Sequence, residues 1–239
     1  MLGHFLAHYR TSGVADFFVA VDPRFERSVT EFASEYNIKV ISDLDVADTV
    51  IGEVSAVTEM RRRHQHDTEW VIIVDLDEFV ECRGSIQPII TRAEGEGANV
   101  VTAIMWDRFS LDGRVRGFRR DDNLSQIYPI RARFIRDVMF GCDIKGVLVK
   151  GLLASNVAHH TFKSEIICSE VLNISHYKWT DGSIDRLRTA CRMVLAAGLP
   201  WLEEYARILD HYERNGRFAW EEFGGEPIAA PPSERRGGP

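Results

Sequence analysis

Two acidic residues separated by one position stand directly after the most apolar stretch of the sequence. Residues 70–74 are Trp-Val-Ile-Ile-Val, and Asp75 and Asp77 follow with Leu76 between them. The β-branched run predicts a buried strand, so both carboxylates would emerge together at its end. Carboxylate oxygens are preferred ligands of Mg²⁺ and Mn²⁺, which keep coordination positions open for phosphate oxygens. The pair therefore indicates a divalent cation site, with a solvated acidic turn as the alternative.

Helices and strands are predicted to alternate through the first 105 residues and so to position this motif. The periodicity indicates helices over residues 2–12, 25–36, 48–66 and 85–97, and strands over residues 16–22, 39–42, 70–74 and 99–105. Such alternation is typical of parallel βαβ units in an α/β sheet, where ligands bind beyond the carboxyl ends of the strands. Acidic residues fall at those expected ends, namely Asp22, Asp43, Asp45, Asp75 and Asp77.

The rest of the chain is less regular. Residues 107–123 are rich in Arg, Asp and Gly and predict a long excursion near a sheet edge that could act as a lid. Strands are expected over residues 126–134 and 143–153, the second one paired antiparallel, and helices over residues 183–197 and 201–215. We expect one domain over residues 1–223 and a disordered Gly/Pro/Arg-rich tail over residues 224–239.

Composition narrows the class of protein. A chain of 239 residues with 45% hydrophobic content can bury a substantial core. The net charge of −7 argues against nucleic acid as the main partner, although one metal ion can neutralise a diphosphate locally. No apolar run is long enough for a transmembrane segment and the N-terminus lacks a signal peptide, so a cytoplasmic location is expected. The cysteines have no metal-ligand spacing and are expected to be reduced and mostly buried: Cys82, Cys142, Cys168 and Cys191.

The acidic motif resembles a segment of a known family. Residues 70–79, Trp-Val-Ile-Ile-Val-Asp-Leu-Asp-Glu-Phe, look like the DxD segment of glycosyltransferase family 2-like proteins with a GT-A fold. Residues 5–14 resemble the first helix of that family, and residues 176–179, His-Tyr-Lys-Trp, resemble its C-terminal strand. The resemblance covers residues 2–195 and implies a GT-A, Rossmann-like mixed sheet flanked by helices, with further helices at the C-terminus. Family members normally begin with a strand carrying an Asn-Glu pair, whereas this sequence begins at the helix that follows it.

This resemblance implies a metal-dependent glycosyltransferase of the hexosyltransferase kind. The donor would be a nucleotide diphosphate sugar, expected to be a UDP-sugar, and the acceptor a hydroxyl group of a carbohydrate or another molecule. Mn²⁺ or Mg²⁺ would be held by Asp75, Asp77 and His176. Residues 159 and 160, both His, are a second candidate for the histidine ligand, and a buried His176 bonded to a backbone carbonyl is the structural alternative.

The resemblance also implies how the donor is bound. Asp75 and Lys145 would face the diphosphate, Asp22 would bond the base or ribose, and Asp45 would lie near the nucleoside. Each residue beyond the metal motif has a simpler interpretation as well. Asp22 precedes Pro23 and suits a turn, Asp45 suits a loop, and a lysine beside a strand is often a solvated edge charge.

An inverting transfer needs a carboxylate that takes the proton of the acceptor hydroxyl. Spacing after the metal motif favours Glu165 or Glu170, and Asp107 and Asp143 remain candidates. Four large aromatic residues could stack on sugars or belong to the core: Trp106, Phe109, Trp179 and Trp201.

Two other functions suit the same carboxylates. A nucleotidyl or phosphoryl transferase would also use a metal at this position, but it would be expected to carry an early Gly-rich, basic phosphate loop. A truncated or degenerate GT-A domain would act only as a binding module.

Overall fold

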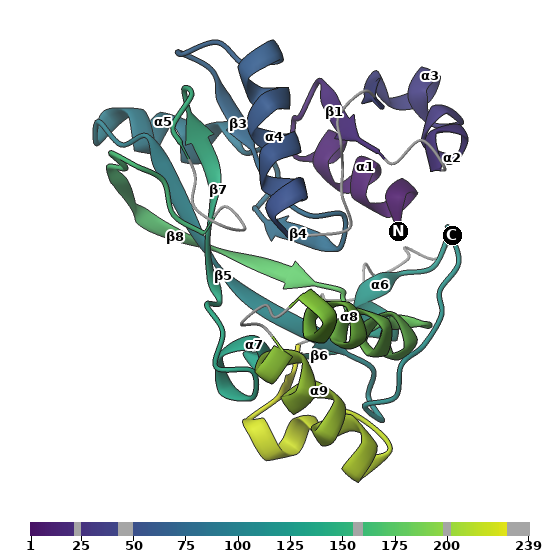
Figure 1. The fold of residues 1–239 in the computed structure, drawn as a ribbon. Helices are drawn as coiled ribbons and strands as arrows, with labels where there is room; N and C mark the ends of the chain where they lie inside the picture. The colour runs from purple at the N-terminus through teal and green to yellow at the C-terminus, as the bar shows by residue number, and fades with distance from the viewer. Residues whose placement is uncertain (22–24, 43–49, 155–159, 198–201, 229–239) are drawn as a thin grey trace, which may run out of the picture. The chain divides into compact units, whose positions relative to one another are not determined.

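The computed structural model describes residues 1–21, 25–42, 50–154, 160–197 and 202–228 (Figure 1). The chain divides into two compact units: Met1–Met105 with Ile144–Ile174, and Trp106–Asp143 with Ser175–Pro239. Strands β5 and β8 each continue from one unit into the other. The expected single domain over residues 1–223 stays a prediction.

The first unit contains most of the helices and strands expected from the first half of the sequence. Its helices are α1 (Leu2–Thr11), α2 (Glu26–Thr30), α3 (Ala33–Tyr36), α4 (Val50–His64) and α5 (Gln87–Gly95). Its strands are β1 (Phe17–Ala20), β2 (Ile38–Ile41), β3 (Trp70–Ile72), β4 (Glu78–Glu81), β7 (Ile144–Lys150) and most of β5 (Val100–Phe109) and β8 (Ile167–His176). The helix expected over residues 25–36 is therefore split in two, and Asn37 ends the second half in a left-handed conformation.

Helix α4 links two sheets of this unit (Figure 1). Strands β1 and β2 form a parallel two-stranded sheet, and Ala56 of α4 packs with Ile41 of β2. Val57, on the next position of α4, packs against the cluster that contains Ile73 and Val149 beside β3 and β7. Burying apolar side chains against both sheets fixes the helix between them.

The larger sheet is mostly antiparallel, which corrects the expectation of parallel βαβ units there. Strands β1 and β2, joined through α2 and α3, do form one parallel unit as expected. Strand β7 lies between β3 and β5 and runs antiparallel to both of them. Strands β3 and β5 therefore share one direction and are joined through α5, as the periodicity predicts, but they are not neighbours. Strand β7 lies between them, and this strand order depends on pairing between residues that are far apart in the sequence. The class is mixed α/β, and the expected antiparallel pairing of residues 143–153 is confirmed.

The second unit combines a short antiparallel sheet with helices. Strand β6 (Ile130–Ala132) pairs with residues 107–109 of β5, and β9 (Glu226–Pro227) pairs with β6. Its helices are α6 (Leu124–Ile127), α7 (Phe134–Asp137), α8 (Ser183–Ala197), α9 (Leu202–Asn215) and the 3₁₀ helix η3 (Trp220–Phe223). Helices α8 and α9 lie side by side, joined by an ion pair between Arg188 and Glu213 of 3.0 Å (Figure 1).

An aromatic cluster forms the core of the second unit. Phe134 contacts Trp179 and Phe218 with ring centroids 5.3 and 5.4 Å apart, and Phe109 lies 5.7 Å from Phe134. Because Phe109 and Trp179 are buried here, these two of the four aromatic candidates belong to the core. Trp106 is half-buried beneath the guanidinium of Arg131, whose carbon is 4.9 Å from the ring centroid.

Several expected boundaries in the second half move. Helix α8 matches residues 183–197, and α9 matches residues 201–215 to within one residue. Strand β5 continues to Phe109, so the predicted excursion starts later, and α6 occupies the beginning of the predicted strand 126–134. The predicted tail contains β9, and residues 229–239 lie outside the described part of the chain.

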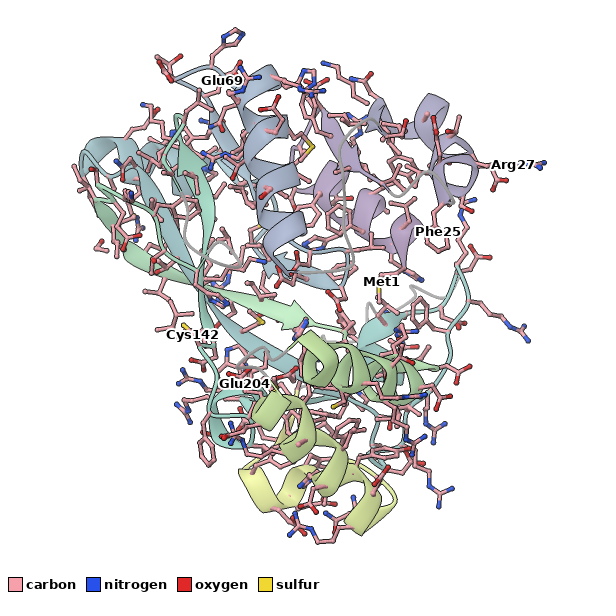
Figure 2. The ribbon with its side chains drawn as sticks, in the orientation of Figure 1. Met1, Phe25, Arg27, Glu69, Cys142 and Glu204 are labelled. Atoms are coloured by element: carbon pink, nitrogen blue, oxygen red, sulfur yellow. The ribbon has the colours of Figure 1, made fainter. Side chains whose placement is uncertain are left out.

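All four cysteines are free thiols, as expected. Only Cys168 is buried, Cys82 and Cys191 are half-buried, and Cys142 is exposed (Figure 2). Within the part of the chain that the structure describes, no helix has the length and apolar character that a membrane crossing requires.

Candidate functional site

The acidic motif lies just beyond the end of β3, as the sequence predicts. Ile73 continues the pairing of β3 by donating its backbone N–H to the Val147 carbonyl at 2.9 Å. Asp75 follows with a side chain that is 71% exposed, and Asp77 is half-buried. The two carboxylates therefore follow one strand, and one of them is open to solvent. Strand β3 itself is half-buried, which corrects the expectation of a buried strand.

The antiparallel register brings Lys145 to this motif. Trp70 pairs with Lys150 and Ile72 pairs with Leu148. Continuing the same register by three residues places Asp75 opposite Lys145, the first of them after β3 and the second near the beginning of β7. The contact between Asp75 and Lys145 is thus a consequence of strand pairing, and Lys145 is not the solvated edge charge that its position in the sequence suggested.

Lys145 joins two carboxylates from the same turn. Its Nζ donates to Glu78 Oε2 at 2.7 Å and to Asp75 Oδ2 at 3.2 Å. The side chains of Lys145 and Glu78 are 3% and 2% exposed, so this is a buried ion pair. Burial opposes the charged ammonium, but the charges of Glu78 and Asp75 outweigh it and raise the pKa of Lys145 above its usual value. The lysine stays protonated at neutral pH.

Glu78 closes the turn that carries the motif. Its backbone N–H donates to the Asp75 carbonyl at 3.0 Å, and its Oε2 accepts from the Asp75 backbone N–H at 2.9 Å. Reasoning from sequence did not assign a role to Glu78. A third acidic residue directly before the apolar pair Phe79-Val80 was the available signal, because a buried carboxylate needs a cation within reach.

Tyr9 of α1 supports the same segment from the other side. Its hydroxyl donates to the Glu78 carbonyl at 2.9 Å and accepts from the Val80 backbone N–H at 3.0 Å. Burial raises the pKa of Tyr9, so the hydroxyl keeps its proton and both bonds persist. Helix α1 therefore positions the start of β4 and, through it, the Glu78 carboxylate.

The charges of this group suit a divalent cation. Three acidic residues, Asp75, Asp77 and Glu78, lie within four positions of the chain, and the Lys145 ammonium contacts two of them. Among the described residues, no group of three or more His, Cys, Asp or Glu side chains is arranged to hold a metal ion. A cation here would take its protein oxygens from Asp75 and Asp77 and its remaining ligands from phosphate and water, as Mg²⁺ commonly does.

His176 belongs to a different group of residues, in the second unit. Its Nδ1 lies 3.0 Å from Asp107 Oδ1, to which Trp179 Nε1 also donates at 2.9 Å. The Ile135 backbone N–H donates to the other Asp107 oxygen at 3.1 Å. His176 is thus a buried histidine that contacts a carboxylate. Its assignment as the third metal ligand stays a prediction that none of these contacts supports.

The candidate bases have partners of their own. Glu165 accepts from the Phe162 backbone N–H at 2.9 Å, and Glu170 pairs with Arg92 at 3.3 Å. Asp143 pairs with Arg133. Asp107 is fully buried and accepts three hydrogen bonds, so an acceptor hydroxyl has no access to it. Glu165 and Glu170 are half-buried and remain the candidates.

The other predicted residues are placed as follows. His160 Nδ1 lies 2.6 Å from the Ile144 carbonyl, the bond of a satisfied histidine. Asp22, Asp45, His159 and Trp201 lie outside the described residues, as does Asp43.

No protein-family model matches this chain, and no curated protein matches it either. The function is therefore inferred from the geometry of the site.

Proposed function

We propose that this protein is a metal-dependent glycosyltransferase with a GT-A fold. It would move a sugar from a nucleotide diphosphate sugar, with a UDP-sugar as the expected donor, to a hydroxyl acceptor with inversion. The observation that carries the proposal is the exposed Asp75 beside Asp77 at the end of β3, held by the buried Lys145–Glu78 pair. The mixed α/β architecture is compatible with the GT-A assignment.

Each part of the site has a task under this proposal. Mn²⁺ or Mg²⁺ on Asp75 and Asp77 would bind the diphosphate and stabilise the charge that develops as it leaves. Lys145 is buried, so we assign it to orienting Asp75 rather than to contacting phosphate. One carboxylate, Glu165 or Glu170, would take the proton from the acceptor hydroxyl.

A binding module without catalytic activity is the second candidate, and one contact favours it. The Lys145 ammonium already neutralises part of the charge on Asp75, with Nζ 3.2 Å from Oδ2. A cation must compete with this ammonium for the carboxylate, which would weaken metal binding. A domain that binds its ligand without a metal would tolerate the same arrangement.

Thermal unfolding with added ligands tests the proposal. The protein is heated alone, with Mn²⁺, and with Mn²⁺ plus UDP or GDP, and the midpoint temperature is recorded. A ligand that binds only the folded state at 100 times its dissociation constant adds about 2.7 kcal/mol. We expect a rise of several degrees that needs both Mn²⁺ and one nucleotide.

The matched variant is Asp75→Asn with Asp77→Asn. Asp75 is mostly exposed and Asp77 is half-buried, so the double variant should fold with nearly the wild-type midpoint while losing the nucleotide-dependent rise. A rise that survives in the double variant would remove the metal assignment. A folded wild-type protein that responds to no nucleotide would favour the binding module instead.

A further inference from the structure

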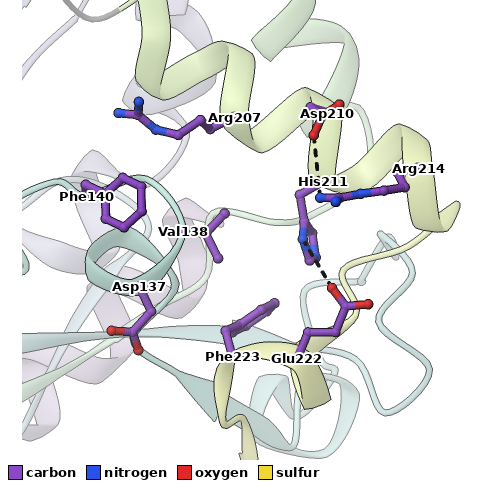
Figure 3. A pocket seen from close by; sticks show the side chains of 9 residues that line it. All are labelled: Asp137, Val138, Phe140, Arg207, Asp210, His211, Arg214, Glu222 and Phe223. Atoms are coloured by element: carbon purple, nitrogen blue, oxygen red, sulfur yellow. Dashed lines mark ion pairs between the residues drawn. The ribbon is translucent and has the colours of Figure 1, made fainter.

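The second unit contains a pocket that the proposed chemistry of the first unit does not use. It has a volume of about 300 Å³, at the lower end of the range of ligand sites (Figure 3). The last residue of α7 and residues that follow it form one wall, and side chains of α9 and η3 form the others. The lining residues are Asp137, Val138, Phe140, Arg207, Asp210, His211, Arg214, Glu222 and Phe223.

The pocket is lined by three acidic side chains and two arginines, and most of these charges have ion-pair partners in or beside the pocket. Arg214 pairs with Asp210 at 3.4 Å, and Arg207 pairs with Glu203 of the same helix at 3.5 Å. Asp137 pairs with the neighbouring Arg136 at 2.6 Å. A phosphate or sulfate ligand is best held by guanidinium groups that are not already committed to carboxylates. The lining therefore favours a neutral ligand with many hydroxyl groups over an anion.

His211 adds a neutral polar group to the wall. Its Nε2 accepts from the Ala219 backbone N–H at 3.1 Å, so the proton of the neutral ring is on Nδ1. Nδ1 faces Glu222, with 3.9 Å between the nitrogen and Oε2 (Figure 3). Burial lowers the pKa of His211 even though Glu222 opposes this, and the ring remains uncharged at neutral pH.

Phe140 is the feature that points to a ligand. Its side chain is 74% exposed at the pocket, an unusual position for a phenylalanine, and its φ of 58° lies in the left-handed region. Gly141, the next residue, donates its N–H to the Ile135 carbonyl at 2.9 Å and closes the same turn. A glycine at position 140 would adopt this φ without strain. The protein instead has an exposed aromatic ring on a strained backbone, where a glycine would be more stable.

The Phe140 ring is held in place. The guanidinium of Arg207 lies over it with 5.2 Å between the central carbon and the ring centroid. The same guanidinium donates from Nη2 to the Met139 carbonyl at 2.8 Å, which ties α9 to the residue before Phe140. An aromatic surface fixed next to carboxylates and guanidiniums combines an apolar face with hydrogen-bonding groups.

We propose that this pocket binds a neutral sugar ring. The face of C–H groups on a pyranose would stack on Phe140, and its hydroxyls would bond to the polar groups of Asp137, Arg214 and Glu222 that line the pocket. Binding of the sugar does not depend on the proposed transfer reaction. Its role as a contact for a carbohydrate acceptor does rest on that proposed function.

Saturation-transfer difference NMR with methyl glycosides tests the proposal. The full chain is mixed, without metal or nucleotide, with the methyl glycosides of glucose, galactose, mannose and N-acetylglucosamine. We expect saturation of the ring protons of at least one glycoside. Phe140→Gly should abolish this signal and leave the unfolding temperature unchanged or higher, because glycine relieves the left-handed backbone.

Ser164→Gly is the control, because Ser164 is also left-handed, with φ of 59°, and it lies in the first unit. It should keep the glycoside signal and show the same direction of change in unfolding temperature. The proposal is overturned if the wild-type protein binds no glycoside, or if Phe140→Gly binds as well as wild type. A lower unfolding temperature for Phe140→Gly than for Ser164→Gly would mark Phe140 as structural and would also overturn it.

Inorganic phosphate separates the two kinds of ligand. If phosphate shifts the resonances of His211 while no glycoside does, the pocket is an anion site and the proposal is wrong. The wild-type protein could bind a glycoside and yet show no thermal shift with Mn²⁺ and nucleotide. That result would refute the proposed transferase and leave the sugar pocket standing, so the two proposals can fail separately.

Discussion

Glu78 in the first unit and Asp107 in the second are both buried carboxylates, and they are stabilised in different ways. Glu78 in the first unit is 2% exposed and faces the full positive charge of Lys145 at 2.7 Å. Asp107 in the second unit is 0% exposed and has three neutral or titratable donors: the Trp179 indole, the His176 imidazole and the Ile135 backbone N–H. One is an ion pair and the other a hydrogen-bonded carboxylate.

The two acidic groups differ in their access to solvent. Lys145 contacts Glu78 and also reaches Asp75, whose carboxylate is mostly exposed. Asp107 has its donors inside the unit and offers no oxygen to solvent. Exposure next to a buried and fixed neighbour, rather than acidity alone, is therefore the useful signal.

Removing the positive charge of Lys145 should have the largest effect on the free energy of unfolding. Lys145→Met leaves Glu78 buried without its ion-pair partner, and breaking such a pair costs about 3–5 kcal/mol. Urea unfolding at neutral pH measures the loss. Lys145→Met combined with Glu78→Gln should recover much of it, because the orphaned charge is gone. A loss below about 1 kcal/mol in the single variant would mean that Lys145 is not needed to stabilise Glu78.

The matching change in the second unit is Asp107→Asn, with a smaller expected effect. An asparagine has the same shape but only one acceptor oxygen, so its NH₂ group would face one of the groups that now donate to Asp107. We expect this mismatch to lower the free energy of unfolding by about 2 kcal/mol. Asp75→Asn is the exposed counterpart and should change the free energy of unfolding by less than about 1 kcal/mol. If Asp75→Asn were the more destabilising of the two, the contrast between the two carboxylates would be wrong.

The smallest expected effect is the change in unfolding free energy with pH that arises from one histidine in each unit. Burial lowers the pKa of His8 in the first unit and of His211 in the second. The unfolded chain, with histidines titrating near 6.5, then binds more protons than the folded chain, so stability is present above about pH 6.5 and is lost as the pH falls below it.

Unfolding midpoints in urea from about pH 7 to about pH 5.5 measure this slope. His211→Gln keeps an acceptor for the Ala219 N–H and should flatten the decline, and His8→Gln should do so independently. Because the two residues lie in different units, their effects should add. A decline that persists unchanged in the double variant would locate the pH dependence in other groups.

Local patterns predicted much of the fold. The β-branched run before Asp75 gave β3, and the periodicity of residues 183–197 gave α8 with its observed boundaries. Both depend on neighbours in the sequence, whose spacing reports which side chains share a face. The mixed α/β class follows from such elements.

Pairing between distant residues could not be predicted in the same way. The insertion of β7 between β3 and β5 depends on pairs 76–80 positions apart with β3 and 40–49 positions apart with β5, and it makes the larger sheet antiparallel where parallel strands were expected. His176 illustrates the consequence for the site, because nothing in its surroundings in the sequence indicates that Asp107 is its partner. The contact of Asp75 with Lys145 was not predicted, because it depends on the antiparallel register.

The hydroxyl of Tyr9 takes the place of a neighbouring strand beside β4. By donating to the Glu78 carbonyl and accepting from the Val80 N–H, it reproduces the pair of bonds that one residue of a parallel strand would make with β4. Tyr9 is 2% exposed, so no water can replace its hydroxyl at these two backbone groups. A helix side chain thus completes the hydrogen bonding of a buried strand, and Tyr9→Phe would leave a buried carbonyl and a buried N–H without these bonds.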